Sequence, residues 1–141
     1  MNSIIDTASS PIGDFEKYVK ANPFMEYCHI GICSVEPDGR SEISVTLAPE
    51  LLNLHGTIHG GLFYTLADCV AGISARSDGN DYITESAQIN FLRSTKSGAV
   101  FAKGEIVKRG GHITVVRVTI FDCAGKLLSD SSVTLVKMEK R

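Results

Sequence analysis

The sequence lacks several features that would point to whole classes of protein. There is no basic excess, because 14 Lys and Arg residues against 16 Asp and Glu residues give a net charge of -2. A broad positive surface for nucleic acid is therefore not expected. No stretch approaches the ~18 consecutive apolar residues of a membrane-spanning helix. The first ten residues, MNSIIDTASS, have no basic start or long apolar segment, so we expect no signal peptide and a cytoplasmic location.

Cysteine pairing patterns and metal-binding motifs are also missing. No C-x-x-C motif occurs, and the cysteines have the distribution of free thiols in a reducing compartment: Cys28, Cys33, Cys69 and Cys123. Neither His55 nor His59 has a second acid or a cysteine at metal-ligand spacing, so we expect no metal. No G-x-S-x-G motif is present, which argues against a nucleophilic serine at a strand-to-helix turn.

The composition is that of a soluble globular protein that folds as a single domain. The chain has 141 residues, a length that is sufficient for one hydrophobic core. Of these residues 43% are hydrophobic and 21% are charged, as in ordinary globular proteins. We expect an N-terminal segment, residues 1–24, with a short amphipathic helix over Asp14–Lys20 that ends before Pro23. The main domain would span residues 25–141 and begin with strands at Cys28–Val35 and Glu42–Leu47.

The best helix candidate is His59–Arg76. Leu62, Leu66, Val70 and Ile73 form one apolar stripe, which smaller apolar residues widen until the helix is apolar on nearly all sides and expected to be buried. Strand-like segments follow it: Tyr82–Leu92, Val100–Lys108, His112–Phe121 and Leu127–Met138. The turns between them have hairpin character, which predicts antiparallel pairing: Lys96–Gly98, Gly110–Gly111 and Cys123–Lys126. His112–Phe121 alternates, which predicts that one face carries Thr114, Val116, Val118 and Ile120. The sequence therefore predicts an α+β fold, one long helix against an antiparallel sheet.

Two glycines open this helix, in the stretch HGTIHGGLFYTLAD at residues 55–68. Without a Cβ atom, Gly60 and Gly61 let a ligand approach backbone N–H groups at the positive end of the helix dipole. Such N–H groups can stabilise the oxyanion of an acyl-transfer reaction. The alternative is that the two glycines only let the helix start close to the sheet.

Asp68 is a carboxylate within the same apolar helix. Burial of a carboxylate is costly unless it is paired, and a buried acid of this kind is a candidate catalytic group. Two structural alternatives stay open: Thr65, one turn earlier, could pair with it, or it could lie on a solvated side of the helix.

The spacing of these two groups has a geometric consequence. Eight residues separate Gly60 from Asp68, which is ~12 Å along a helix at ~1.5 Å per residue. One reacting carbonyl cannot touch both groups of one helix, whereas two helices packed antiparallel across a two-fold axis could supply one group each. If both groups act in one reaction, the protein is at least a dimer with shared sites.

Together these residues resemble the hotdog-fold acyl-CoA thioesterases of the PaaI-like (phenylacetic acid degradation) subgroup. The H-G-G-x-x-x-x-L-A-D core stands at His59–Asp68, preceded by N-x-H-G at Asn53–Gly56, and the later strands are similar to the family over roughly residues 25–138. The resemblance implies the hotdog fold, a sheet wrapped around one central helix. It also implies dimers that pair again into tetramers, and hydrolysis of acyl-CoA without a cofactor, coenzyme A being part of the substrate.

Site residues follow from the resemblance, position by position. Asp68 matches the catalytic acid, acting as nucleophile or as general base on water. Gly60 matches the residue whose N–H polarises the thioester carbonyl from the other subunit. Asn53 matches a residue that positions water or the thioester, and His59 a supporting neighbour. Thr84 falls where relatives place Ser or Thr near the acid, with Glu85 or Ser86 as the alternatives.

The resemblance also implies a place for coenzyme A near the turn that follows residue 108. The residues we expect to contact it are basic or lack a side chain: Gly61, Arg93, Lys108, Arg109, Gly110, Gly111 and His112. The basic ones could instead be solvated turn charges. Two other functions stay in view: a non-catalytic acyl-CoA-binding module, and a hotdog hydratase, whose expected Asp/His motif order this sequence lacks.

Overall fold

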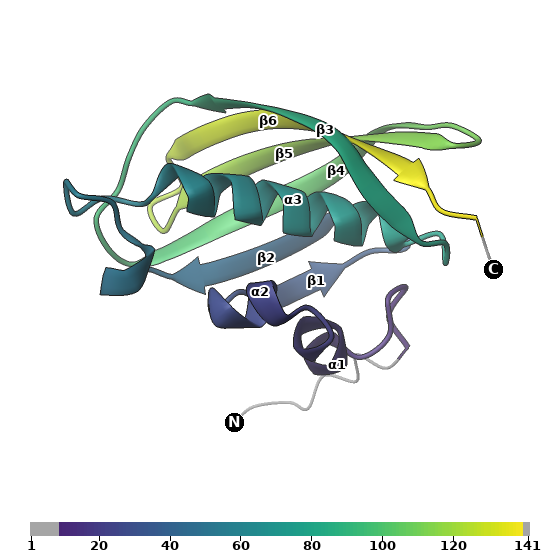
Figure 1. Ribbon diagram of the computed structural model, residues 1–141, viewed down its shortest axis with the longest axis horizontal. Helices are drawn as coiled ribbons and strands as arrows, with labels where there is room; N and C mark the ends of the chain where they lie inside the picture. The colour runs from purple at the N-terminus through teal and green to yellow at the C-terminus, as the bar shows by residue number, and fades with distance from the viewer. Residues whose placement is uncertain (1–8, 140–141) are drawn as a thin grey trace.

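A computed structural model describes residues 9–139. The prediction that the chain starts without a signal peptide rests largely on residues 1–8, outside this range. Six strands form one antiparallel sheet in the order β1-β2-β4-β5-β6-β3. Their bounds are β1 Gly31–Val35, β2 Ser41–Thr46, β3 Tyr82–Phe91, β4 Ala99–Arg109, β5 Ile113–Asp122 and β6 Leu127–Lys137. The sheet curves around the long helix α3, Gly60–Arg76, which confirms the predicted α+β hotdog architecture (Figure 1).

The core lies between the concave face of the sheet and α3, and alternation along the strands explains it. On β5, Val116, Val118 and Ile120 are completely buried against the helix, while Arg117 between them faces outward. Such period-two alternation is expected for a sheet with one solvated face. The apolar stripe of α3 meets these side chains, and Leu66 and Val70 at its centre are completely buried.

Strand β3 does not occupy the place that its turn suggested. A hairpin at Lys96–Gly98 would pair it with β4, but β3 pairs with β6, with Ala87 opposite Val133. It therefore ends the sheet, and within residues 9–139 its outer edge pairs with no other strand. The three strands β4, β5 and β6 do form the predicted run of antiparallel hairpins.

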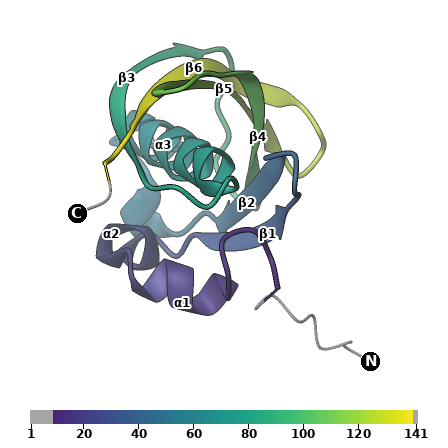
Figure 2. The same ribbon diagram turned by 90° about the vertical axis from the view of Figure 1, so that its right-hand side faces the viewer.

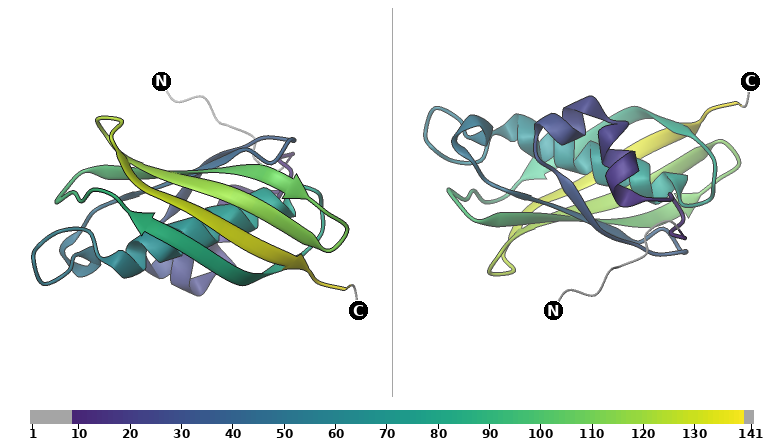
Figure 3. Two further views of the ribbon diagram at one scale, coloured as in Figure 1. Left: turned by 90° about the horizontal axis from the view of Figure 1, so that it is seen from above. Right: turned by 90° about the horizontal axis from the view of Figure 1, so that it is seen from below.

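The N-terminal segment contains two short helices instead of one, α1 Phe15–Lys20 and α2 Pro23–Tyr27. Pro23 ends the first and occupies the opening turn of the second, where its missing N–H is harmless. The predicted strand start at Cys28 was too early, because His29 adopts a left-handed conformation, φ 62°, that turns the chain into β1. Figure 2 and the view from below in Figure 3 show both helices lying across the side of the molecule where α3 is not covered by the sheet.

Candidate active site

Asp68 lies in the middle of α3, and its nearest polar partner comes from the edge strand. The Thr84 hydroxyl donates a hydrogen bond to Asp68 Oδ1 over 2.5 Å. The register of β3 against β6 shifts directly after Thr84, so that Glu85 forms a bulge. Bulges re-aim neighbouring side chains. The structure thus brings Thr84, and neither Glu85 nor Ser86, to the acid.

The side of α3 that carries Asp68 is exposed, so the prediction of a helix buried on nearly all sides was wrong. Gly61, Tyr64 and Asp68 are all exposed and follow one another at helical spacing on this side. The sheet curves around α3 and leaves one side of the helix uncovered (Figure 2). Thr65 does not pair with Asp68, since its hydroxyl donates to the Gly61 carbonyl over 2.8 Å.

Two pockets meet at Asp68, and both have α3 on one side and the N-terminal helices on the other. One, of about 420 Å³, runs toward Tyr64 and Phe24. The second, of about 270 Å³, runs toward the C-terminal end of α3 and includes Thr84 in its wall. A carboxylate at the junction of two pockets can reach a ligand that enters either one.

Cys69 lines both pockets but is unsuited to act as a nucleophile. Burial, followed by the neighbouring negative charge of Asp68, raises the pKa of its thiol to about 12. A thiol with this pKa stays protonated near neutral pH, whereas the thiolate is the reactive form. All four cysteines of the chain are free.

Gly60 and Gly61, the first two residues of α3, differ in their surroundings. The His59 side chain caps the helix, with Nδ1 accepting a hydrogen bond from the Gly61 N–H over 2.8 Å. A Cβ at Gly61 would lie 3.0 Å from that ring nitrogen, a tight contact, so glycine there leaves room for the cap. A Cβ at Gly60 would meet nothing closer than 3.8 Å, the distance to the Phe91 ring. Close packing of the helix against the sheet therefore does not explain Gly60.

The helix cap does not pair the Gly60 N–H. The His59 carbonyl accepts from the N–H groups of Leu62 and Phe63, and the His59 ring accepts from Gly61. No acceptor for the Gly60 N–H occurs within residues 9–139. An unpaired N–H at a helix N-terminus is suited to hold negative charge.

Asn53 organises the loop before the helix. Its side-chain oxygen accepts from the N–H groups of His55 and Thr57, over 2.9 and 3.1 Å, and its amide donates to the Thr57 hydroxyl over 2.9 Å. These bonds close the turn that leads into His59. Asn53 thereby helps to hold the conformation of the loop from which α3 starts.

The residues expected to contact coenzyme A do not form one cluster. Lys108, Gly110 and His112 lie at the β4–β5 hairpin, near the C-terminal end of α3. Arg93 lies beyond the other end of the sheet, where it donates to the Leu127 carbonyl over 3.4 Å. The length of β5 separates these two places by ~25 Å at ~3.3 Å per residue. One chain alone cannot bring Arg93 and the hairpin to the same phosphate.

The Arg109 guanidinium is engaged in hydrogen bonds within the chain. Its guanidinium donates to the Ala75 carbonyl at the end of α3, to Asp78 and to the Tyr82 hydroxyl, each over 3.0 or 3.1 Å. A cation at a helix C-terminus also complements the helix dipole. Both residues are exposed, but Lys108 has no ion pair among the described residues, whereas the Arg109 guanidinium is paired with Asp78. The cation of the hairpin whose charge is unpaired is therefore Lys108, and the Arg109 guanidinium is already engaged by the fold.

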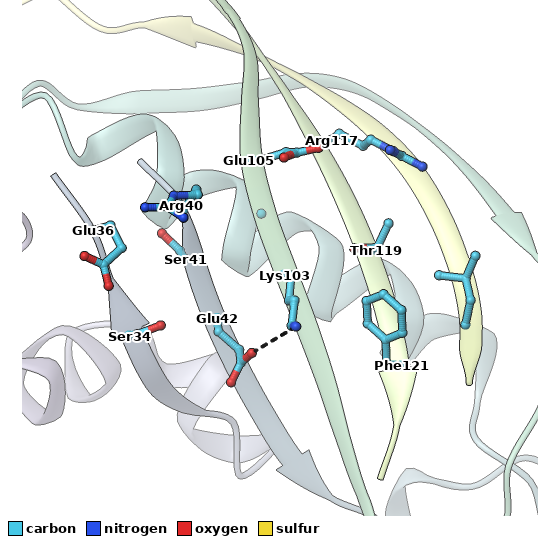
Figure 4. A pocket seen from close by; sticks show the side chains of 12 residues that line it. Ser34, Glu36, Arg40, Ser41, Glu42, Lys103, Glu105, Arg117, Thr119 and Phe121 are labelled. Atoms are coloured by element: carbon cyan, nitrogen blue, oxygen red, sulfur yellow. Dashed lines mark ion pairs between the residues drawn. The ribbon is translucent and has the colours of Figure 1, made fainter. Parts of the chain in front are cut away.

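A separate hollow of about 550 Å³ lies on the outer face of the sheet, away from α3 (Figure 4). Two of its cations are paired within the sheet: Lys103 lies 3.8 Å from Glu42, and Arg117 makes a two-point contact with Asp130. It holds neither Asp68 nor Thr84. We therefore place the candidate active site at the two pockets beside α3.

Comparisons with known proteins identify the family of the chain. A sequence model of the Thioesterase superfamily matches residues 55–129. The 1,4-dihydroxy-2-naphthoyl-CoA hydrolase of Listeria monocytogenes is 32% identical over 115 residues, 79% of this chain and 93% of that protein. The acyl-coenzyme A thioesterase PaaI of Escherichia coli is 29% identical over 87 residues, 62% of this chain and 61% of that one.

A solved structure is similar over nearly its whole length. It is a thioesterase protein of Streptococcus pneumoniae with coenzyme A, at a TM-score of 0.79 and 27% identity, covering 87% of this chain and 98% of that one. Two further structures of that protein carry an aspartate-to-alanine and a threonine-to-alanine change at positions sixteen residues apart. Asp68 and Thr84 are separated by the same sixteen positions.

Proposed function

The chain belongs to the thioesterase superfamily, a family of thioester hydrolases, and from that premise we propose that it hydrolyses acyl- or aryl-CoA to the free carboxylate and coenzyme A. The observation that carries the proposal is the Asp68–Thr84 pair at the junction of two pockets. A hydroxyl that donates to one carboxylate oxygen fixes the acid and leaves its other oxygen for the reaction.

The proposed chemistry needs a base or nucleophile and an oxyanion site. As a general base, Asp68 takes a proton from water while the water oxygen attacks the thioester carbonyl carbon. As a nucleophile, Asp68 itself attacks, and water then hydrolyses the mixed anhydride. In both routes the Gly60 N–H of a second chain stabilises the oxyanion and coenzyme A leaves as the thiolate. Rapid-quench mass spectrometry separates the routes, because only the second forms an acyl adduct on Asp68.

We propose a two-fold dimer in which the free edges of β3 pair and the exposed sides of α3 face each other. Support comes from apolar surface at this place: Ile83 and Phe91 of β3 are 59% and 52% exposed, and Tyr64 of α3 is 46% exposed. Unpaired edges and grouped apolar side chains are typical of surfaces that become covered. Antiparallel pairing of two helices would bring Gly60 of one chain toward Asp68 of the other.

The same dimer would reconcile the separated coenzyme A contacts. Antiparallel pairing of β3 places the Arg93 end of one chain beside the β4–β5 hairpin of the other. We propose that the phosphates of coenzyme A lie there, between Arg93 of one chain and Lys108 of its mate. Gly111 suits the pantetheine arm, since a Cβ there would meet nothing within 4 Å. Association of two dimers into a tetramer is part of the proposal, and light scattering tests it.

Turnover of a panel of CoA esters, followed by thiol release, tests the function directly. Asp68→Ala should abolish hydrolysis and leave the fold intact, because the Asp68 side chain is exposed in the single chain. A fully active Asp68→Ala protein would refute the mechanism. A protein that binds the esters without turnover would be an acyl-CoA-binding module, and hydration of an enoyl-CoA would identify a hydratase.

Mixing of inactive variants tests whether the sites are shared. Asp68→Ala chains supply an intact Gly60 end, and Asn53→Ala chains supply an intact Asp68. Unfolding and refolding the two together should restore part of the activity. A mixture of Asp68→Ala with Asp68→Asn is the control and should stay inactive; equal activity of the two mixtures would exclude sharing.

A further inference from the structure

The pocket between Asp68 and the C-terminal end of α3 has a polar group at each end. Asp68 and Thr84 mark one end, and Tyr18 of α1 and Arg76 of α3 mark the other. The wall between them includes the apolar side chains of Met25 and Leu135, the Cys69 thiol and the polar Asn22. Neither Tyr18 nor Arg76 has a part in the hydrolysis proposed above.

Gly72 allows Arg76 to face this pocket. A Cβ at Gly72 would lie 2.6 Å from Arg76 Nη1, so the guanidinium occupies the space that any other residue would fill. Long side chains on a helix point toward its N-terminus, which here is the direction of Asp68. Four residues separate Gly72 from Asp68, or ~6 Å along the helix axis.

Contacts on the far side hold the guanidinium in place. Arg76 Nε donates to Asp81 over 2.9 Å and Nη2 donates to the Tyr82 carbonyl over 2.7 Å. Nη1 donates to the Tyr18 hydroxyl over 3.2 Å. A guanidinium has five N–H groups, so these three bonds leave two for other acceptors.

The Tyr18 hydroxyl is a further donor. It accepts from Arg76, and its own hydrogen has no acceptor within the part of the chain that the structure describes. Burial raises the pKa of Tyr18, against the lowering effect of the Arg76 charge, so the phenol stays protonated and able to donate. The far end of the pocket thus presents donors, while the Asp68 end presents an acceptor.

We propose that Tyr18 and Arg76 bind an oxygen atom at the far end of the acyl group, so that the enzyme prefers short acyl-CoA esters whose acyl group ends in a hydroxyl or carboxylate. The ~6 Å between the two ends corresponds to about four bonds between the reacting carbonyl carbon and the distal oxygen. A plain alkyl chain of the same length would leave the donors desolvated and without an acceptor, which disfavours its binding. The inference rests on the proposed acyl-CoA hydrolysis.

Three CoA esters with acyl groups of matched length test whether Tyr18 and Arg76 bind a distal oxygen: succinyl-CoA, 4-hydroxybutyryl-CoA and pentanoyl-CoA. We expect the wild type to show a kcat/KM about tenfold higher for at least one oxygen-bearing ester than for pentanoyl-CoA. A preference for succinyl-CoA identifies a carboxylate as the ligand, and a preference for 4-hydroxybutyryl-CoA identifies a hydroxyl. Equal kcat/KM for all three would overturn the inference and leave the proposed function standing.

Tyr18→Phe removes only the donor and should reduce this preference ratio about tenfold. Tyr27→Phe is the matched control, since Tyr27 is 74% exposed and outside the pocket, and its ratio should equal that of the wild type. An unchanged ratio in Tyr18→Phe would count against the pair. If that variant does not fold, as judged by its thermal melt, Arg76→Lys provides the same comparison with the positive charge retained.

Binding separates failure of this inference from failure of the proposed function. If the wild type hydrolyses none of the esters, the proposed function is wrong, and calorimetry with Asp68→Asn still measures their affinities. Tighter binding of an oxygen-bearing ester, lost in Asp68→Asn/Tyr18→Phe, supports the donor pair. Equal binding of the three esters overturns it.

Discussion

Thr84→Val is the sharpest test of the candidate site, because it replaces the hydroxyl by a methyl group of similar size and so removes one hydrogen bond. Valine has nearly the shape of threonine and is favoured in strands, so β3 should be preserved. What disappears is the donor that holds Asp68 Oδ1 at 2.5 Å. Without it the carboxylate can turn about its side-chain torsions away from the reacting carbonyl.

The size of the effect follows from the kind of hydrogen bond. A hydrogen bond to a charged group contributes ~1.5–3 kcal/mol. Thr84 is only half-buried, so the lower end of this range applies. If the bond is needed in the transition state, kcat/KM falls by about tenfold or somewhat more. Because the pair lies at the surface of the single chain, the free energy of unfolding should change by less than ~1 kcal/mol.

The assay is thiol release from the best CoA ester, with thermal melting in parallel. Thr84→Ser keeps the hydroxyl and should keep most of the activity. Wild-type kcat/KM in Thr84→Val would refute the positioning role. Equal losses in Thr84→Val and Thr84→Ser would refute it as well, because a variant that keeps the hydroxyl would then be as impaired as one that lacks it.

Other predictions concern stability and coenzyme A. Arg109→Met should lower the free energy of unfolding by ~3 kcal/mol in urea titrations at pH 7, the low end for buried ion pairs because this one is partly exposed. Burial opposes ionisation of Asp78, yet its hydrogen bonds and the Arg109 charge hold its pKa below the usual value of about 4. Wild-type stability should therefore fall as pH drops from about 4 through that lowered pKa, and Arg109→Met should lose less over this range. Gly104→Ala should cost ~1–3 kcal/mol, since its Cβ would lie 2.5 Å from a core hydroxyl, whereas Gly111→Ala should be nearly neutral. Lys108→Ala should raise KM for acyl-CoA several-fold at low salt and less at high salt, with stability unchanged.

Much of the fold was predictable because it depends on local pattern. The stripe from Leu62 to Ile73 predicted α3 to within one residue of its ends, and the alternation in β5 predicted which side chains face the core. The place of β3 was not predictable, since pairing with β6 rather than β4 depends on contacts between segments far apart in sequence. Pro23 was interpreted only as the end of a helix, although proline is equally suited to begin one.

The site was predictable as a set of residue types and less so as an arrangement. The motif pointed to Asp68 and to Thr84 as its possible neighbour, and the structure brings these two together. The motif left open whether Asp68 is buried or lies on a solvated side of the helix, because a helical pattern does not say which side the sheet covers. Arg109 looked like any turn cation, and its contacts with Asp78 and Tyr82 become visible only in three dimensions.

The place of β3 in the sheet also bears on how the protein folds. Strands β4, β5 and β6 are joined by short turns, so their pairing closes small loops and can form early. β3 must instead find β6 across the 35 residues that lie between them, and such non-local contacts form more slowly. The bond between Thr84 and Asp68 therefore depends on a pairing that is expected to form after the β4–β5–β6 hairpins. A chain that has not paired β3 with β6 would contain every candidate site residue and still lack the site, which ties formation of the site to completion of the sheet.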